Sequence, residues 1–194
     1  MRLYIKYMVS HRCKMKVEEE LDKLKLHYKI LDLGEVEIEC SITPEQYNQL
    51  KAALLLSELE LIDNKKLILV EKIKVLIINM VHYINESPKT KNSTYISHQL
   101  GYDYTYLANL FSQVTGITIE QYIITNKIER VKELILYNEL TLSQIAYQLN
   151  YSSLAHLSNQ FKKVTGLSPR LFKQLEQEER FVLEGLEKRC LRRC

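Results

Sequence analysis

Phe111-Ser-Gln-Val-Thr-Gly116 and Phe161-Lys-Lys-Val-Thr-Gly166 are two closely similar stretches that lie 50 residues apart. A second similar pair precedes them, Ile96-Ser-His-Gln-Leu-Gly-Tyr102 and Ile145-Ala-Tyr-Gln-Leu-Asn-Tyr151, 49 residues apart. Similarity at a fixed period indicates a duplicated unit. Each copy predicts a short helix, a tight turn and a second helix, with one residue gained in the turn region of the second copy. This order of elements is the one that lays a helix in the major groove of DNA.

Polar residues mark the helix ends of the second copy. Thr141 and Gln144 are expected to form a capping box, in which each side chain satisfies a free backbone amide at the helix start. Asn150 tolerates the left-handed conformation that the turn requires. Ser152 or Ser153 then caps the following helix.

The first copy follows the same plan, with Gly101 at the turn and Asp103 as the helix cap. Apolar side chains at helical spacing anchor the second helix of each copy to the first. These anchors are Leu107, Leu110 and Phe111 in the first copy and Leu157 and Phe161 in the second. The side chains left to face outward are Thr105, Tyr106, Ala108, Asn109 and Ser112, and Ala155, His156, Ser158, Asn159 and Lys162.

One long helix is expected between the copies. It opens with a capping box at residues 118–121, and an apolar stripe runs through Ile124, Ile128 and Ile135 to about Tyr137. Roughly 19 residues at about 1.5 Å each give about 28 Å. Successive major-groove faces of DNA are about 34 Å apart, so a rigid connector of this length suits two recognition helices on one side of a duplex.

The first 70 residues predict a ferredoxin-like α+β sandwich with the order β-α-β-β-α-β. The expected elements are a strand at 2–8, a helix at 11–26, two strands at 28–33 and 36–40 joined at Gly34, a helix from Thr43-Pro44, and a strand at Lys66–Val70. A helix over residues 70–84 leads out of this sandwich, and the polar stretch 86–93 is the best linker. We therefore expect a sandwich domain at 1–70, an all-α domain with two helix-turn-helix units at 71–176, and a basic tail at 177–194.

Composition is compatible with this plan. Five Gly and three Pro in 194 residues leave little material for the turns of an all-β fold. The net charge of +3 permits a polyanionic partner, and the excess of Lys and Arg over Asp and Glu falls on residues 87–176 rather than on the first 86. No apolar run is long enough to span a membrane, and the four cysteines form no Cys-x-x-Cys pair, so a cytoplasmic protein is expected.

Residues 70–175 resemble the DNA-binding domain of AraC/XylS-type bacterial transcriptional regulators. The resemblance is carried by Leu142-Ser-Gln-Ile-Ala-Tyr-Gln-Leu-Asn-Tyr151, by the spacing to Leu157 and Phe161, and by Phe161-Lys-Lys-Val-Thr-Gly-Leu-Ser-Pro169. It implies two helix-turn-helix units that bind adjacent major grooves of double-stranded DNA. It places base contacts at Thr105, Ala108 and Asn109 in the first unit and at Leu154, Ala155, Ser158 and Asn159 in the second.

Asparagine takes the place of the arginine or glutamine that family members often have at such positions. Asn109 and Asn159 can pair with N6 and N7 of adenine, which predicts a target rich in A·T pairs. Phosphate contacts are expected from Lys162, Lys163 and Arg170 and from the capped helix starts. The full set of candidate DNA-binding residues is Thr105, Tyr106, Ala108, Asn109, Ser112, Ser153, Ala155, Ser158, Asn159, Lys162, Lys163 and Arg170.

The segment Met8-Val-Ser-His-Arg-Cys13 resembles the metal-binding loop of heavy-metal-associated domains, as does the expected fold around it. Such loops hold a soft metal ion between two cysteines, but here Ser10 stands in the first cysteine position, and a hydroxyl is a poor soft ligand. Cys13, alone or with His11, is thus a weak candidate for a soft metal ion, and no cofactor or metal site is assigned. The domain is otherwise expected to bind a small effector or to form a homodimer.

The glycines form no phosphate-binding loop or dinucleotide fingerprint, and no histidine pair has metalloenzyme spacing, so an enzyme is not expected. The sequence predicts a sequence-specific transcription regulator that places two recognition helices in adjacent major grooves. The alternative is a metal-handling or protein-interaction adaptor with a decayed DNA-binding face, since the arginines and one cysteine are missing.

Overall fold

The computed structural model describes residues 1–39, 41–83 and 91–175. These residues form two compact units, residues 1–80 with 91–119 and residues 81–83 with 120–175. Most of the expected linker and almost all of the expected basic tail lie outside the described residues, as do Cys40, Cys190 and Cys194.

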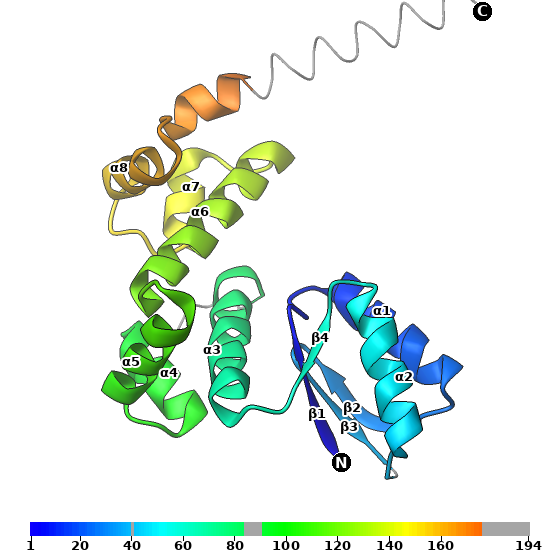
Figure 1. Cartoon of the computed structure of the whole chain (residues 1–194). Coiled ribbons are helices and arrows are strands. Elements are labelled where there is room, and N and C mark those ends of the chain that lie inside the picture. The colour runs from blue at the N-terminus through cyan, green and yellow to red at the C-terminus, as the bar shows by residue number, and fades with distance from the viewer. Residues whose placement is uncertain (40, 84–90, 176–194) are drawn as a thin grey trace, which may run out of the picture. The chain divides into compact units, whose positions relative to one another are not determined.

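A four-stranded antiparallel sheet opens the first unit (Figure 1). Its strands are β1 (Arg2–Lys6), β2 (Tyr28–Asp32), β3 (Glu35–Ile38) and β4 (Glu60–Ile62), in the order β2-β3-β1-β4. Every neighbouring pair is antiparallel. Gly34 joins β2 to β3 with a φ of 77°, a conformation that costs glycine little, so the expected hairpin is confirmed.

Two helices, α1 (His11–Lys23) and α2 (Pro44–Leu55), cover one face of this sheet (Figure 1). Ser10 caps α1 and Thr43 caps α2. Alternate strand residues and the inner faces of both helices share one apolar core, which includes Leu3, Ile5, Val17, Leu21, Val36, Ile38, Leu50 and Leu54. The element order is therefore the predicted one.

The predicted strand at Lys66–Val70 is wrong, because these residues form the first turns of α3 (Lys65–His82). The side chain of Asn64 accepts hydrogen bonds from the backbone N–H groups of the second and third helix residues, at 2.9 and 3.4 Å. Such a cap favours a helix start. The fourth strand is instead the three-residue β4, which pairs with β1.

The two predicted helix-turn-helix pairs are present. The first unit contains α4 (Asn92–Leu100) and α5 (Tyr104–Thr115), and the second contains α7 (Leu142–Gln148) and α8 (Leu154–Thr165). The expected connector is α6 (Ile119–Tyr137), which has 19 residues. Its inner face packs with α7 and α8 around Ile128, Val131, Ile145, Leu157 and Phe161.

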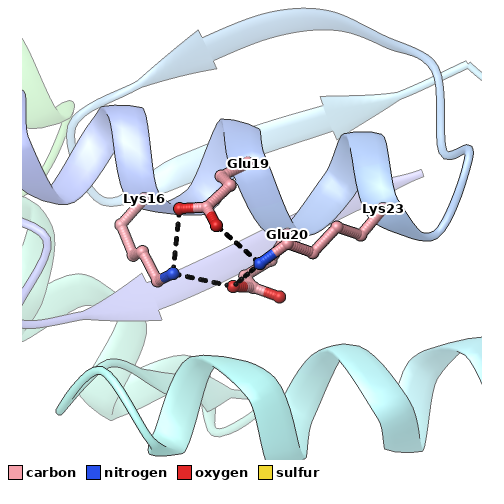
Figure 2. Close-up of polar contacts among 4 residues, drawn as sticks. All are labelled: Lys16, Glu19, Glu20 and Lys23. Carbon is pink, nitrogen blue, oxygen red and sulfur yellow. Dashed lines mark hydrogen bonds and ion pairs between the residues drawn. The ribbon is translucent and has the colours of Figure 1, made fainter.

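A network of ion pairs joins four side chains of α1 (Figure 2). Lys16 Nζ lies 2.9 Å from carboxylate oxygens of both Glu19 and Glu20, and Lys23 Nζ lies 2.5 and 3.0 Å from the same two groups. The hydrogen bonds from Lys23 and Lys16 lower the pKa of Glu19 to about 2. Pairs at this spacing support a helix modestly, and here they also give the buried carboxylate of Glu20 two positive partners.

No helix among the described residues is both long enough and apolar enough to cross a bilayer.

Candidate nucleic-acid interface

The turn of the first helix-turn-helix is built as the sequence predicts. Gly101 ends α4 in the left-handed conformation, with a φ of 71°, and Asp103 caps α5. The carboxylate of Asp103 accepts hydrogen bonds from the backbone N–H groups of Thr105 at 2.8 Å and Tyr106 at 3.2 Å. These two residues fix where α4 ends and where α5 begins.

One side of α5 is buried and the other is accessible. The predicted anchors Leu107, Leu110 and Phe111 are all buried. The five candidate contacts lie on the accessible side: Thr105, Tyr106 and Asn109 are exposed, and Ala108 and Ser112 are partly exposed. The buried anchors of α5 are therefore different residues from those predicted to contact DNA.

The second helix-turn-helix is also capped as predicted. Thr141 and Gln144 form the capping box that starts α7. Asn150 makes the turn with a φ of 54°. Of the two serines proposed as the next cap, Ser153 fills the role, because its side chain accepts a hydrogen bond from the backbone N–H of His156 at 3.1 Å.

The two turns differ by one residue, as the changed offset indicated. Tyr102 and Tyr151 occupy matching positions, and the second turn then contains the additional Ser152. Tyr102 is exposed and stacks on Tyr106, with ring centroids 5.8 Å apart. Tyr151 is buried and meets the ring of His156 edge-on at 5.2 Å, while Ser152 Oγ lies 3.0 Å from Nδ1 of His156. The sequence showed the inserted residue but not these different surroundings.

The outer side of α8 carries the candidates of the second unit. The anchors Leu157 and Phe161 are buried. Ser153, at the cap, is exposed, as are Ala155, Asn159, Lys162 and Lys163, and Ser158 is partly exposed. Arg170 is exposed in the helical turns that follow α8. All seven side chains can therefore reach a partner.

Charge is distributed unequally between the two recognition helices. Helix α5 contains no Lys, Arg, Asp or Glu, whereas α8 ends with Lys162 and Lys163. A helix N-terminus attracts phosphate through its free amides and its dipole. The carboxylate of Asp103 opposes this attraction at α5, while the neutral Ser153 leaves it intact at α8. The second unit is therefore the better electrostatic match for a phosphate backbone.

Lys127 connects α6 to the end of α7, a role that sequence reasoning missed. Its Nζ donates a hydrogen bond to the carbonyl oxygen of Leu149 at 2.8 Å and lies 5.3 Å from the ring centroid of Tyr151. Burial lowers the pKa of Lys127. The available signal was its place directly beside Ile128 in the apolar stripe of α6.

Cys13 has hard oxygen neighbours rather than soft ligands. Its Sγ lies 3.2 Å from Ser10 Oγ and 3.7 Å from the carbonyl oxygen of Tyr7. His11 is exposed. Within residues 1–39, 41–83 and 91–175, no three His, Cys, Asp or Glu side chains are grouped so as to hold a metal ion.

Residues 96–174 match a family model that is described as a helix-turn-helix domain. The chain is 26% identical over 98 residues to YtdP of Bacillus subtilis, an uncharacterized HTH-type transcriptional regulator; the match covers 50% of this chain and 12% of that protein. It is 27% identical over 99 residues to the F1 operon positive regulatory protein of Yersinia pestis, covering 50% of this chain and 33% of that protein. The chain thus spans a minor part of the length of these relatives.

Among solved structures, the DNA-binding domain of the global transcriptional factor AdpA, in complex with a target DNA, is similar with a TM-score of 0.50 and 14% identity. The similarity covers 57% of this chain and 95% of that chain, and at this identity it shows the fold alone. Family match, relatives and fold agree with the duplicated helix-turn-helix geometry. Over residues 96–174 the chain therefore matches the model of a helix-turn-helix domain, and it is similar in sequence to transcription regulators and in fold to a DNA-binding domain.

Proposed function

We propose that this chain is a sequence-specific, DNA-binding transcription regulator that places α5 and α8 in successive major grooves. The observation that carries the proposal is that each of these helices buries its apolar anchors on one side and leaves its polar side chains accessible on the other. Each follows a short helix and a tight turn, the arrangement in which the second helix enters the groove. The 19 residues of α6 give about 28 Å, close to the groove spacing.

The base contacts are assigned to the outer faces of the two helices. Asn109 on α5 and Asn159 on α8 are the exposed amides that can pair with adenine. The other candidate residues on each helix contribute shape and backbone contacts. Lys162, Lys163 and Arg170 are assigned to phosphates, which fix register without specifying sequence.

The N-terminal 70 residues are proposed as a ferredoxin-like sensor or dimerisation module, and residues 71–176 as the DNA-binding domain. The sheet order β2-β3-β1-β4, with two helices on one face, supports the ferredoxin-like assignment. The oxygen neighbours of Cys13 give no support to a soft metal site of the heavy-metal-associated type. A regulator that binds DNA in a bacterium acts in the cytoplasm.

The alternative, an adaptor with a decayed DNA-binding face, draws on one observation. Helix α5 lacks any charged side chain, and its cap is a carboxylate. The first unit alone would therefore bind a phosphate backbone weakly. Weak binding with no preference for sequence would favour the adaptor.

Selection of bound duplexes from a random DNA pool tests the proposal. The full chain is expected to enrich a motif with two A·T-rich halves, and Asn159→Ala is expected to relax preference in one half by about 1–3 kcal/mol at the affected base. Asn48→Ala, which removes an exposed amide from α2, is the matched control and should leave the motif unchanged. No enrichment with the unaltered chain would overturn the proposal.

A further inference from the structure

The first unit contains a cleft of about 360 Å³ that no proposed DNA contact uses. It lies between the sheet face opposite α1 and α2, helix α3 and the end of α4. Tyr4 and Glu35 line it from the sheet, Glu71 and Lys72 from α3, and Leu100 from α4. Small-molecule sites commonly have volumes of about 300–1,000 Å³. The cleft is therefore large enough for a small organic ligand.

One carboxylate oxygen in this cleft lacks a hydrogen-bond donor. Glu35 Oε2 is buried and accepts no hydrogen bond from the described residues. Lys72 Nζ forms an ion pair with it at 3.5 Å, too long for a good hydrogen bond, and lies 4.9 Å from the ring centroid of Tyr4. A buried acceptor without a donor is costly, so a ligand N–H group that reached it would be stabilised.

The remaining charges at the cleft also favour a positive ligand. Glu71 is buried beside the cleft and pairs at 2.7 Å with Lys74, a residue that does not line it. Asp32 contributes a further carboxylate, so among the described residues the carboxylates of Asp32, Glu35 and Glu71 line the cleft together with one lysine, Lys72. Leu33, Val75 and Leu76 supply apolar surface. An adjoining hollow that contains Arg2 and Lys65 is the more basic side and is not where a cation would settle.

We propose that this cleft binds a small organic cation, whose charged N–H group donates to Glu35 and lies over the ring of Tyr4, with its apolar part against Val75 and Leu76. A cation above a tyrosine ring is attracted by the ring electrons. The bound cation takes the place of the Lys72 ammonium group, which lies 3.5 Å from Glu35 Oε2 and 4.9 Å from the ring centroid of Tyr4.

The position of Leu100 connects this cleft to the first recognition helix. Leu100 is the last residue of α4, and Gly101 and the Asp103 cap of α5 follow directly. A ligand that touches Leu100 therefore binds with an affinity that depends on how α4 packs against α3 and the sheet. This coupling rests on the proposed function, because it makes the cleft the effector site of a DNA-binding regulator.

Titration of the isotope-labelled full chain with benzamidine, followed by nuclear magnetic resonance, tests the site. Benzoate is the matched probe, with the same ring and the opposite charge. Benzamidine is expected to shift the amide signals of Tyr4, Glu35, Lys72 and Leu100, and benzoate is not. Glu35→Gln should weaken benzamidine binding by about tenfold or more, since it removes the charge and keeps the shape.

Glu37→Gln is the control, since Glu37 lies on the same strand, pairs with Arg2 and lines neither hollow. It should change benzamidine affinity by less than about twofold, which fits the small contribution of exposed pairs. If the Glu35→Gln variant does not fold, Tyr4→Leu provides a second test, and this substitution is also expected to weaken benzamidine binding. Equal or tighter binding of benzoate, or no shift at the cleft with either probe, would overturn the proposal.

A gel-shift assay with and without benzamidine then tests the coupling. The cation is expected to change the DNA affinity of the unaltered chain and not that of Glu35→Gln. If benzamidine binds the cleft and DNA affinity does not change, the effector role is refuted while the site stands. If the chain binds no DNA, the proposed function fails, and the direct titration still decides the site.

Discussion

At the scale of single residues, Tyr151 has a buried hydroxyl that makes no hydrogen bond with the described residues. An unsatisfied buried hydroxyl costs stability, and phenylalanine fills the same space without it. We expect Tyr151→Phe to raise the free energy of unfolding by about 1 kcal/mol. Urea denaturation followed by circular dichroism measures this change. The exposed Tyr137→Phe is the control and should have no measurable effect; a destabilised Tyr151→Phe would show that a partner of the hydroxyl exists.

The same residue predicts a pH dependence. Burial raises the pKa of Tyr151 from 10.0 to about 12 in the folded chain. Between these values the unfolded chain loses the proton while the folded chain keeps it, so stability falls as pH rises through this range. The free energy of unfolding of the unaltered chain should therefore fall further below that of Tyr151→Phe as the pH rises from 10 to 12. The difference should grow by up to about 3 kcal/mol for two pKa units.

Which residues are buried was predictable, but how distant residues meet was not. Leu107, Phe111, Leu157 and Phe161 repeat at helical spacing, and all four are buried as expected. The hydrogen bond from Lys127 to Leu149 joins two elements, and the place of Lys127 beside the apolar stripe of α6 does not identify its partner. The Glu35–Lys72 pair at the cleft depends in the same way on α3 lying across the sheet.

At the scale of elements, the turn between α4 and α5 needs a left-handed residue. An added Cβ at Gly101 would meet nothing within 4 Å, so only backbone strain opposes substitution. Asn150 holds the matching position in the second unit. Gly101→Ala should lower the free energy of unfolding by about 1 kcal/mol, and Gly101→Asn by less than half as much. Urea denaturation of both variants checks this order, and equal losses would contradict it.

The error at Lys66–Val70 shows what limits element prediction. The four-residue apolar run 67–70 fits a buried strand and a buried helix equally well. Asn64, a good helix cap three residues before this run, was the signal that favoured the helix. The actual strand, β4, has three residues, too few for an alternating pattern to be recognised.

At the scale of the whole molecule, the two lysines of α8 should dominate the salt dependence of DNA binding. Each phosphate contact contributes about 0.9 to the slope of log affinity against log salt concentration. Lys162→Gln with Lys163→Gln should reduce that slope by up to about two and weaken all sequences alike. Lys65→Gln with Lys66→Gln removes another exposed neighbouring pair and is the control. Fluorescence-anisotropy titrations at several salt concentrations measure the slope for each variant. An unchanged slope in the Lys162→Gln, Lys163→Gln variant would contradict the phosphate assignment.

The duplicated architecture could be predicted because similar stretches of sequence occur twice at a nearly fixed separation. The helix ends follow from the capping and turn residues Gly101, Asp103, Thr141 and Ser153. The first five elements of the N-terminal module also followed from its patterns, whereas its last strand did not. The cleft beneath α3 could not be predicted, because it exists only where the sheet, α3 and α4 meet.

The extra Ser152 makes the two halves of the duplication unlike in form as well as in side chains. A dimer of identical subunits approaches a palindrome, and its target looks the same from either end. A single chain with two unlike recognition helices is asymmetric instead, and the two ends of its DNA target differ. A promoter bound by both helices would be bound in one orientation only, so the side from which a transcribing polymerase meets the protein would be set by the order of the two half-sites.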